Sequence, residues 1–447
     1  MATIVISMFP EEGHLIPSFK LGKSLKVQGH QVYYLALADF EEYIRKQGFE
    51  YLPLFAEDFS KGFRAQQTER IANSRGRAFL KEVSQTAFYL KLFQTVREAQ
   101  NPIKRSLLEI GADLCIFDGF LAPLSLMVRH AGLEVISLSI NINLPQAVNY
   151  PPVVTNIVPD NTPASLSKAS MAWKFSGLAI KITNFLIGYN FQKKLTELAT
   201  HFGFPADMVV PAALFPRLRP QLEIPELVLC PQVFDFPRPS VEQGIFYCEP
   251  SIDLDRQEAA FDWSQIDPNK PLIFCTLGSQ SHIYKPSRRF FQTVIDIMRS
   301  RPDWQLIMAL GQKFQAHEFA NVPANVQLLQ WASVEQILPR TSVMITHGGV
   351  GTIKECVYFN VPMVVFPGNR DQPGYAARVV YHELGLMGAM GKVSAQALET
   401  MLNQVIQNPN FRQRVTAMGE EFRALEAASP ALELIQSKLP NTRTVAS

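Results

Sequence analysis

The chain has 447 residues, of which 47% are apolar and 18% charged, and its formal net charge is +2 at pH 7. This length is enough for two or three domains, and the composition is ordinary for a well-packed globular enzyme. The charge shows no basic excess, and no stripe of Lys and Arg indicates a nucleic-acid partner.

The five cysteines stand mostly inside apolar runs, and no Cys or His spacing suggests a metal site. They are therefore interpreted as reduced, buried thiols of a cytoplasmic protein. Residues 1–10 lack the basic segment of a signal peptide and predict a first strand. No run reaches about 18 apolar residues, so we expect no transmembrane helix.

The first half of the chain alternates apolar runs with helical patterns, which is typical of an open, doubly wound α/β sheet. Strands are predicted over residues 3–9, 31–36, 113–117, 134–140, 226–230 and 244–248. A helix is predicted over 17–28, with Pro17 in its first turn. Residues 78–108 predict a long helix or two, and the Pro- and Asn-rich segment 141–165 predicts a long loop.

Residues 172–189 are strongly apolar but are interrupted by Lys174 and Lys181. One interpretation is a buried helix hairpin. The functional interpretation is the wall of an acceptor pocket, or a surface that touches a membrane to collect a lipophilic acceptor. The sequence leaves these alternatives open.

A polar stretch from Glu249 to about Asp267 predicts a linker. A second series of apolar runs follows it, and strands are predicted over 272–276, 305–309, 326–329, 343–345 and 363–366. Helical patterns fill the gaps between them, so the second half also predicts an α/β sheet.

The most informative stretch is 344–378, where a strand, a glycine turn, a helix and a strand form a βαβ unit. Gly348 and Gly349 let the backbone approach a ligand, and the helix start offers unpaired N–H groups. Thr352 and Glu355 are three residues apart and share one helix face. A hydroxyl there suits a phosphate, and a carboxylate one turn further suits the two hydroxyls of a ribose.

The sequence HGGVGTIKE, followed by a proline-bounded strand and RDQPGYAAR, resembles the donor signature of UDP-sugar-dependent glycosyltransferases of the GT-B fold, glycosyltransferase family 1. Plant natural-product and bacterial macrolide glycosyltransferases belong to that family. The resemblance implies two Rossmann-like doubly wound domains that face each other across a cleft. We expect an acceptor-binding domain over 1–250, a nucleotide-sugar-binding domain over 251–425, and a C-terminal helix within 426–447 that packs back on the first domain.

The resemblance also implies roles for individual side chains. Trp331 would stack on the uracil, and Asp371 and Gln372 would bind the sugar, where Gln tends to accompany glucose. The full expected donor-binding set is Gly278, Ser279, Trp331, His347, Gly349, Gly351, Thr352, Glu355, Asp371 and Gln372.

Three positions depart from the family pattern. Val334 stands where plant members have Gln, and Gly351 replaces the plant Asn, as in bacterial members. Tyr375 stands where Asn is common, which leaves the sugar assignment open.

The expected catalytic residues are His14 and Asp118. His14 follows the first strand in a GH-x-x-P pattern that resembles the family's catalytic histidine, and its ordinary pKa suits a general base. Asp118 ends a strand at the same sheet edge and is expected to orient the imidazole. Its alternative role is to cap a helix near Ala122, and Glu11 and Glu12 are competing partners of His14.

These observations predict an inverting, metal-independent hexosyltransferase that uses a UDP-sugar, most simply UDP-glucose, and no cofactor. The acceptor is expected to be a hydrophobic molecule with a hydroxyl group. The alternatives are a UDP-sugar epimerase of GT-B architecture and a non-catalytic nucleotide-sugar-binding protein. A dehydrogenase is disfavoured because no GxGxxG follows the first strand.

Overall fold

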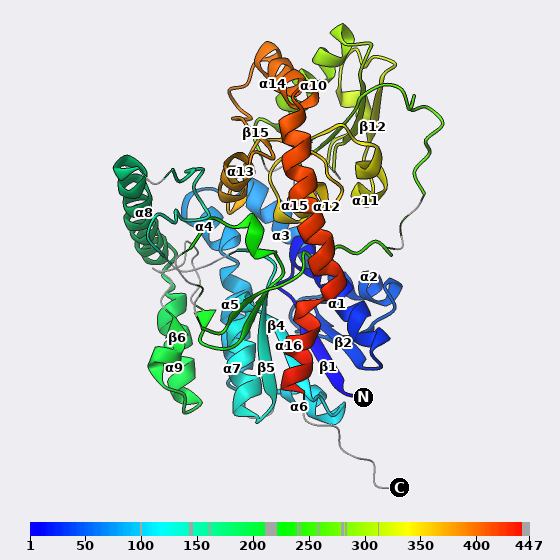
Figure 1. Ribbon diagram of the computed structural model, residues 1–447. Helices are drawn as coiled ribbons and strands as arrows, with labels where there is room; N and C mark the ends of the chain where they lie inside the picture. Colours follow the sequence, from blue (N-terminus) through cyan, green and yellow to red (C-terminus); the bar gives the residue numbers. More distant parts are fainter. Residues whose placement is uncertain are drawn as a thin grey trace.

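The computed structural model describes residues 1–98, 101–142, 146–160, 162–210, 221–238, 241, 243–256, 258, 260–278, 281, 284–311 and 313–439. Within these ranges the chain forms two α/β domains, one above the other in Figure 1. Each domain is built on a parallel sheet with helices on its faces. The predicted fold class, two Rossmann-like doubly wound domains, is confirmed.

The N-terminal sheet has seven parallel strands in the order β3-β2-β1-β4-β5-β8-β9. Strand β4 is buried along its whole length, as expected for a central strand covered on both faces. The strands are β1 (Thr3–Ser7), β2 (Gln31–Ala36), β3 (Glu50–Pro53), β4 (Leu114–Asp118), β5 (Glu134–Ser139), β8 (Glu226–Val228) and β9 (Ile245–Tyr247). A separate antiparallel pair joins β6 (Val209–Val210) and β7 (Gln221–Leu222).

The helices of this half are α1 (Glu12–Val27), α2 (Glu41–Lys46), α3 (Phe63–Asn73), α4 (Gly76–Val83), α5 (Thr86–Thr95), α6 (Pro102–Glu109), α7 (Ala122–His130), α8 (Pro163–Ile187) and α9 (Phe191–His201). The prediction of one or two helices over 78–108 is wrong, because three short helices, α4, α5 and α6, occupy that region. Turns separate them at 84–85 and around 96–98.

The first helix begins five residues earlier than the sequence predicted. The Glu11 carbonyl accepts hydrogen bonds from the His14 and Leu15 N–H groups at 2.9 and 3.0 Å, so the first turn forms ahead of the proline. Pro17 therefore lies inside α1, where it removes the one bond that would reach the Gly13 carbonyl. As a result, His14 stands on the first turn of a helix and not in a loop.

Residues 163–187 form one helix, α8, and the predicted buried hairpin is wrong. The buried positions of α8 include Ala169, Trp173 and Ile180, and the Trp173 Nε1 donates to the Tyr150 carbonyl at 2.7 Å. Its opposite side is exposed. The apolar residues of α8 thus occupy two faces, and only one of these faces packs against the rest of the protein.

The C-terminal sheet has six parallel strands in the order β12-β11-β10-β13-β14-β15. The first strand is central and the order reverses beside it, which is the Rossmann pattern that places ligands at the carboxyl ends of the strands. The strands are β10 (Leu272–Thr276), β11 (Gln305–Ala309), β12 (Val326–Leu329), β13 (Val343–Thr346), β14 (Met363–Val365) and β15 (Gly385–Met387). The helices are α10 (Ser287–Ser300), α11 (Val334–Ile337), α12 (Val350–Tyr358), α13 (Gln372–Tyr381), α14 (Ala395–Gln407), α15 (Pro409–Ala428) and α16 (Pro430–Lys438).

The last two helices run from the upper domain to the lower one, in orange to red in Figure 1. Val415 and Phe422 of α15 are buried in a core cluster with residues of the C-terminal sheet. Ala431 and Ile435 of α16 are buried in the core of the N-terminal domain. The chain changes direction at Ser429, whose φ is 52°. The two domains are thus linked twice, by residues 248–271 and by this helix pair.

Ile142 and residues 146–153 form a further contact between the halves of the chain. Ile142, Tyr150 and Val153 share a core cluster with residues of α13. The Gly374 N–H donates to the Val153 carbonyl at 2.8 Å. All five cysteines are buried and unpaired. Among the described residues, no helix is long and apolar enough to cross a membrane.

Candidate active site

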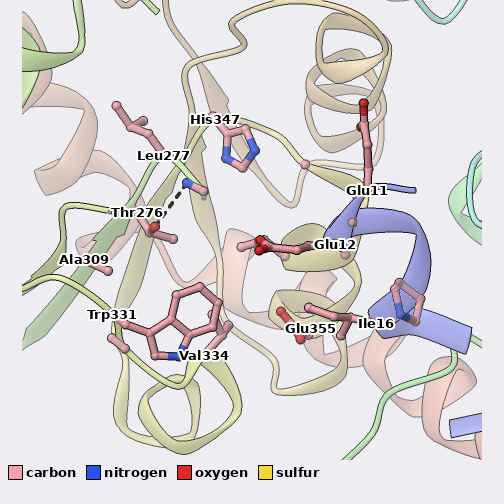
Figure 2. A pocket seen from close by; sticks show the side chains of 18 of the residues that line it. Glu11, Glu12, Ile16, Thr276, Leu277, Ala309, Trp331, Val334, His347 and Glu355 are labelled. Carbon is pink, nitrogen blue, oxygen red and sulfur yellow. Dashed lines mark hydrogen bonds between the residues drawn. The ribbon is translucent and has the colours of Figure 1, made fainter. Parts of the chain in front are cut away.

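A cavity of about 1630 Å³ lies between the two domains and is lined by residues of both. The N-terminal domain lines it with residues that follow β1, β4 and β5, and the C-terminal domain with residues that follow β10 to β14. Figure 2 shows Glu12 and Ile16 of the N-terminal domain on one side, opposite His347, Glu355 and Trp331. The two sheets therefore present their ligand-binding edges to the same space.

His14 and Asp118 are hydrogen-bonded to each other at this edge. The Nδ1 of His14 is 2.6 Å from the Oδ2 of Asp118, and both side chains are almost fully buried. An ionised carboxylate only accepts hydrogen bonds, so Nδ1 carries the proton and the neutral ring has its lone pair on Nε2. The rings of Phe9 and Phe120 lie 5.3 Å from the imidazole, centre to centre, and restrict its rotation.

The backbone fixes the Asp118 carboxylate independently of the histidine. Its Oδ1 accepts from the Phe120 N–H at 2.9 Å, and its Oδ2 accepts from the Phe9 N–H at 3.2 Å. Asp118 thereby caps the short 3-10 helix Gly119–Leu121. The histidine contact is therefore present, whereas the helix that begins at Ala122 has Leu121 at its N-cap and is not capped by Asp118.

Glu11, the competing partner of His14, is engaged elsewhere. Its Oε2 is 2.8 Å from the Nη1 of Arg370, which belongs to the C-terminal domain. Its Oε1 accepts from the Gln85 amide at 3.1 Å. Burial alone would raise the pKa of Glu11, but the charges of Arg370, His14 and Arg64 and the Arg370 hydrogen bond together outweigh burial and lower this pKa to about 2. Glu11 is therefore ionised and forms an ion pair that joins the N-terminal domain to the C-terminal domain across the cavity.

On the opposite wall, His347 is packed tightly between two glycines. A Cβ on Gly278 or on Gly349 would lie 2.8 Å from the imidazole ring. Burial lowers the pKa of His347 to about 4, so the ring is neutral at pH 7. Its buried Nδ1 has no hydrogen-bond partner among the described residues. Such an atom is available to a ligand that enters from the cavity.

Helix α12 begins beside this histidine with Gly349 at its N-cap, directly after Gly348, whose φ is 84°. Gly351, Thr352 and Glu355 all line the cavity, as their spacing on one helix face predicted. The free N–H groups of this first turn are suited to a phosphate.

The Glu355 carboxylate already has a protein partner. It forms an ion pair with Arg256 of the linker, which also lies 3.6 Å from the Oε2 of Glu335. Sequence reasoning missed Arg256, because the two partners are 99 residues apart and a linker arginine has no recognisable spacing. It missed Arg370 as well, although that residue directly precedes the Asp371–Gln372 pair.

Trp331 stands at the rim of the cavity, two residues after β12, and 55% of its surface is exposed. Its Nε1 donates to the Glu258 carboxylate at 3.2 Å. A large exposed ring beside a cavity is suited to stacking on a flat ligand. Val334, where a polar contact was expected to be lost, lies next to the tryptophan in Figure 2.

The Asp371–Gln372 pair begins α13 and lines the cavity. The Gln372 Oε1 accepts from the Gly368 and Asn369 N–H groups at 2.9 and 3.0 Å, and its Nε2 donates to the Tyr284 hydroxyl at 2.8 Å. Gln372 thus also shapes the loop before α13. Asp371 occupies the N-cap of α13 without a side-chain capping bond.

Tyr375 is fully buried, and its hydroxyl accepts from the Ile142 N–H at 2.8 Å. It therefore holds Ile142 in place and does not line the cavity. Ser279, expected at the diphosphate, lies outside the described residues, as does His282. Among the described residues, no three His, Cys, Asp or Glu side chains are grouped so that they would hold a metal ion.

Two Rossmann-like domains, with a histidine–aspartate pair on one and a glycine-flanked helix start on the other, match the architecture that the sequence resemblance implied, that of a GT-B glycosyltransferase. Comparison with known proteins supports this class. Residues 295–438 match the family described as erythromycin biosynthesis protein CIII-like, C-terminal domain.

A curated relative, the uncharacterized UDP-glucosyltransferase YojK of Bacillus subtilis, is 23% identical over 98% of both chains. The crystal structure of the glycotransferase of kitacinnamycin has a TM-score of 0.74 at 21% identity and covers 98% of this chain and 99% of its own. The glycosyltransferase VinC in complex with dTDP has a TM-score of 0.65 at 16% identity over 98% and 99%. The chain is thus a GT-B glycosyltransferase that uses nucleotide sugars, and the resemblance seen in its sequence is confirmed. The epimerase and the non-catalytic binder are not favoured.

Proposed function

We propose that the protein transfers a hexose, in the simplest case glucose from UDP-glucose, to a hydroxyl of a hydrophobic small molecule with inversion at the anomeric carbon. One observation carries the proposal. His14, held by Asp118 behind it, and the start of α12 line the same cavity from opposite domains. A base and a diphosphate site that face each other are what a single in-line displacement requires.

In the proposed step, the acceptor hydroxyl gives its proton to the Nε2 of His14 while its oxygen attacks the anomeric carbon. The bond from that carbon to the nucleoside diphosphate breaks, and the diphosphate leaves with the electron pair. Asp118 stabilises the imidazolium that forms. A positioned base of this kind contributes roughly 10² to 10⁴ in rate.

The departing diphosphate would be bound by the first turn of α12, by Thr352 and by His347. We propose that these groups act without a metal ion. His347 is neutral before the donor binds, because burial lowers its pKa to about 4, so it contributes an N–H donor rather than a charge. Activity is expected to be the same with EDTA as with added Mg²⁺.

The test is the release of UDP from UDP-glucose in the presence of a panel of hydrophobic alcohols and phenols. His14→Ala is expected to lower kcat by roughly 10² to 10⁴ with little change in donor affinity. Asp118→Asn is expected to lower kcat as well, because the imidazolium loses its counter-charge. His317→Ala, on an exposed turn of the C-terminal domain, is the matched control. Full activity of His14→Ala would eliminate the assigned base.

The choice of a ribose donor rests on Glu355, whose carboxylate suits the two hydroxyls of a ribose. The curated relative named above is called a UDP-glucosyltransferase, whereas VinC binds dTDP, so the two nucleotides are the right pair to compare. Measured by calorimetry, the Glu355→Gln variant is expected to bind UDP at least about tenfold more weakly than the wild type does. Its affinity for dTDP is expected to fall by less. Loss of the Arg256 pair affects both nucleotides alike, so the change in the UDP-to-dTDP ratio is the readout. An unchanged ratio would contradict the ribose assignment.

A further inference from the structure

The outer face of α8 is the largest group of exposed apolar side chains on one element in the described part of the chain. Met171, Phe175, Leu178, Ile182 and Phe185 are each at least half exposed, and Phe185 reaches 84%. Their spacing of four, three, four and three residues places them in one stripe along the helix. Leu186 borders the stripe and is 42% exposed. Exposed apolar surface on this scale marks an interaction site.

The charges of α8 are all of one sign. Its sequence, PASLSKASMAWKFSGLAIKITNFLI, contains Lys168, Lys174 and Lys181 and no acidic residue. Lys174 and Lys181 are exposed and, seven residues apart, lie on one edge of the apolar stripe. An apolar stripe edged by lysines is the pattern of a helix that lies in the interface of an anionic bilayer.

The position of α8 fits this role. Figure 1 shows it at the outer edge of the molecule, beside α4. Helix α4 packs against α8 and adds the exposed cations Arg77 and Lys81. The last residue of α4, Val83, lines the cavity between the domains. No described residue of α8 itself lines that cavity, so its apolar stripe is not the wall of the acceptor pocket.

We propose that this face, Met171, Phe175, Leu178, Ile182, Phe185 and Leu186 with Lys174 and Lys181, docks the protein on an anionic lipid bilayer. The buried side of α8, anchored by Trp173, stays on the protein while the stripe enters the headgroup region. A second copy of the chain is a poorer occupant, because a symmetric contact would bring the lysines of two copies together. The docking does not depend on the proposed reaction.

The experiment is co-sedimentation of the whole protein with vesicles, without donor or acceptor. One set of vesicles contains phosphatidylcholine alone, and the other contains phosphatidylcholine with phosphatidylglycerol. The wild type is expected to bind the anionic vesicles more tightly and to lose binding as salt is raised. Phe175→Ser with Phe185→Ser is expected to lower binding to anionic vesicles at least about tenfold.

Lys174→Gln with Lys181→Gln is expected to lower binding to anionic vesicles by about fivefold per lysine and to leave binding to neutral vesicles unchanged. The matched control is Val27→Ser with Leu108→Ser, two exposed apolar residues outside the stripe, which is expected to bind like the wild type. Circular dichroism and the melting temperature check that each variant is folded.

Three results would overturn the proposal. The wild type could fail to bind either vesicle, the phenylalanine variant could bind like the wild type, or sedimentation could show a wild-type dimer that this variant converts to a monomer. The last result would assign the face to a second copy of the chain. Because no sugar donor is present, none of these results bears on the transferase reaction.

Discussion

At the scale of single residues, the site is defined by which groups the protein keeps neutral and which it keeps charged. Burial holds His347 neutral, while the neighbouring charges, with that of Arg370 the largest, hold Glu11 ionised against burial. Under the His14–Asp118 pair lies a further carboxyl group, that of Glu226, at the start of β8. Burial, with a smaller contribution from the charge of Asp118, raises the pKa of Glu226 to about 8.

Glu226 predicts a specific dependence of stability on pH. Its folded pKa is raised above the ordinary value of 4.5, so its contribution is present below pH 4.5 and is lost as the pH rises through 8. Glu226→Gln cannot ionise. Its melting temperature is expected to equal that of the wild type at pH 5 and to exceed it at pH 9. The expected gain in the free energy of unfolding at pH 9 is roughly 3 to 5 kcal/mol.

The melting temperature of both proteins at pH 5, 7 and 9 tests this expectation. Glu134→Gln, at an exposed position on the neighbouring strand β5, is the control and should follow the wild type. If the melting temperature of Glu226→Gln differed from that of the wild type by the same amount at every pH, ionisation of Glu226 would not be the cause of the difference.

At the scale of elements, the contact between α13 and Val153 leaves no room for a side chain. A Cβ on Gly374 would lie 2.2 Å from the Val153 carbonyl oxygen, and backbone on both sides prevents relaxation. Gly374→Ala is therefore expected to destabilise the protein by roughly 2 to 3 kcal/mol, measured by denaturant unfolding.

Gly177 provides the matched control for that substitution. It lies in the middle of α8, and an added Cβ would meet no atom within 4 Å. Gly177→Ala is expected to be neutral or to stabilise by roughly 0.5 to 1 kcal/mol, because alanine loses less backbone entropy in a helix. Equal effects of the two substitutions would contradict the packing argument.

The linker between the two domains contacts residues that line the cavity. Arg256 places a guanidinium on Glu355, and Glu258 accepts from the indole of Trp331. Two residues expected to bind the nucleoside are thus in contact with the segment that joins the domains. In the proposed complex, ribose hydroxyls would compete with Arg256 for the Glu355 carboxylate, which would couple donor binding to the path of the linker.

At the scale of the whole molecule, the Glu11–Arg370 ion pair joins the two walls of the cleft. The pKa of Glu11 is lowered to about 2, so its contribution to stability is present above pH 4.5 and is lost as the pH falls toward 2. At pH 7, Glu11→Gln is expected to cost up to about 3 kcal/mol. The difference from the wild type should shrink toward pH 3.

Melting temperatures at pH 7 and pH 3 test this prediction, and small-angle scattering reports whether the cleft opens in the variant. Glu42→Gln is the control, since Glu42 forms an exposed pair with Lys61 that contributes little. The cross-cleft pair would have no role in joining the domains if the two variants had the same melting temperature and radius of gyration.

The sequence determined a great deal of this protein by itself. Alternating apolar runs specified two parallel sheets, and the motif around Gly348 and Glu355 specified a nucleotide-binding βαβ unit, because these features depend on residues close together in the chain. The contact between His14 and Asp118 was also predictable, since both lie where neighbouring parallel strands end at the same sheet edge.

Only the tertiary structure decided the rest. In the folded protein α1 begins before Pro17, and an apolar face of α8 is exposed to solvent. Tyr375 is fully buried and hydrogen-bonded to Ile142. The fold also pairs Glu11 with Arg370, which are 359 residues apart, and Glu355 with Arg256. The physical reason is that the sequence pattern shows which face of an element is apolar and which is charged. The residue that each side chain contacts depends on how distant segments pack together. Local pattern therefore fixed the elements and the motif, and packing between the domains fixed what each charge and each apolar face contacts.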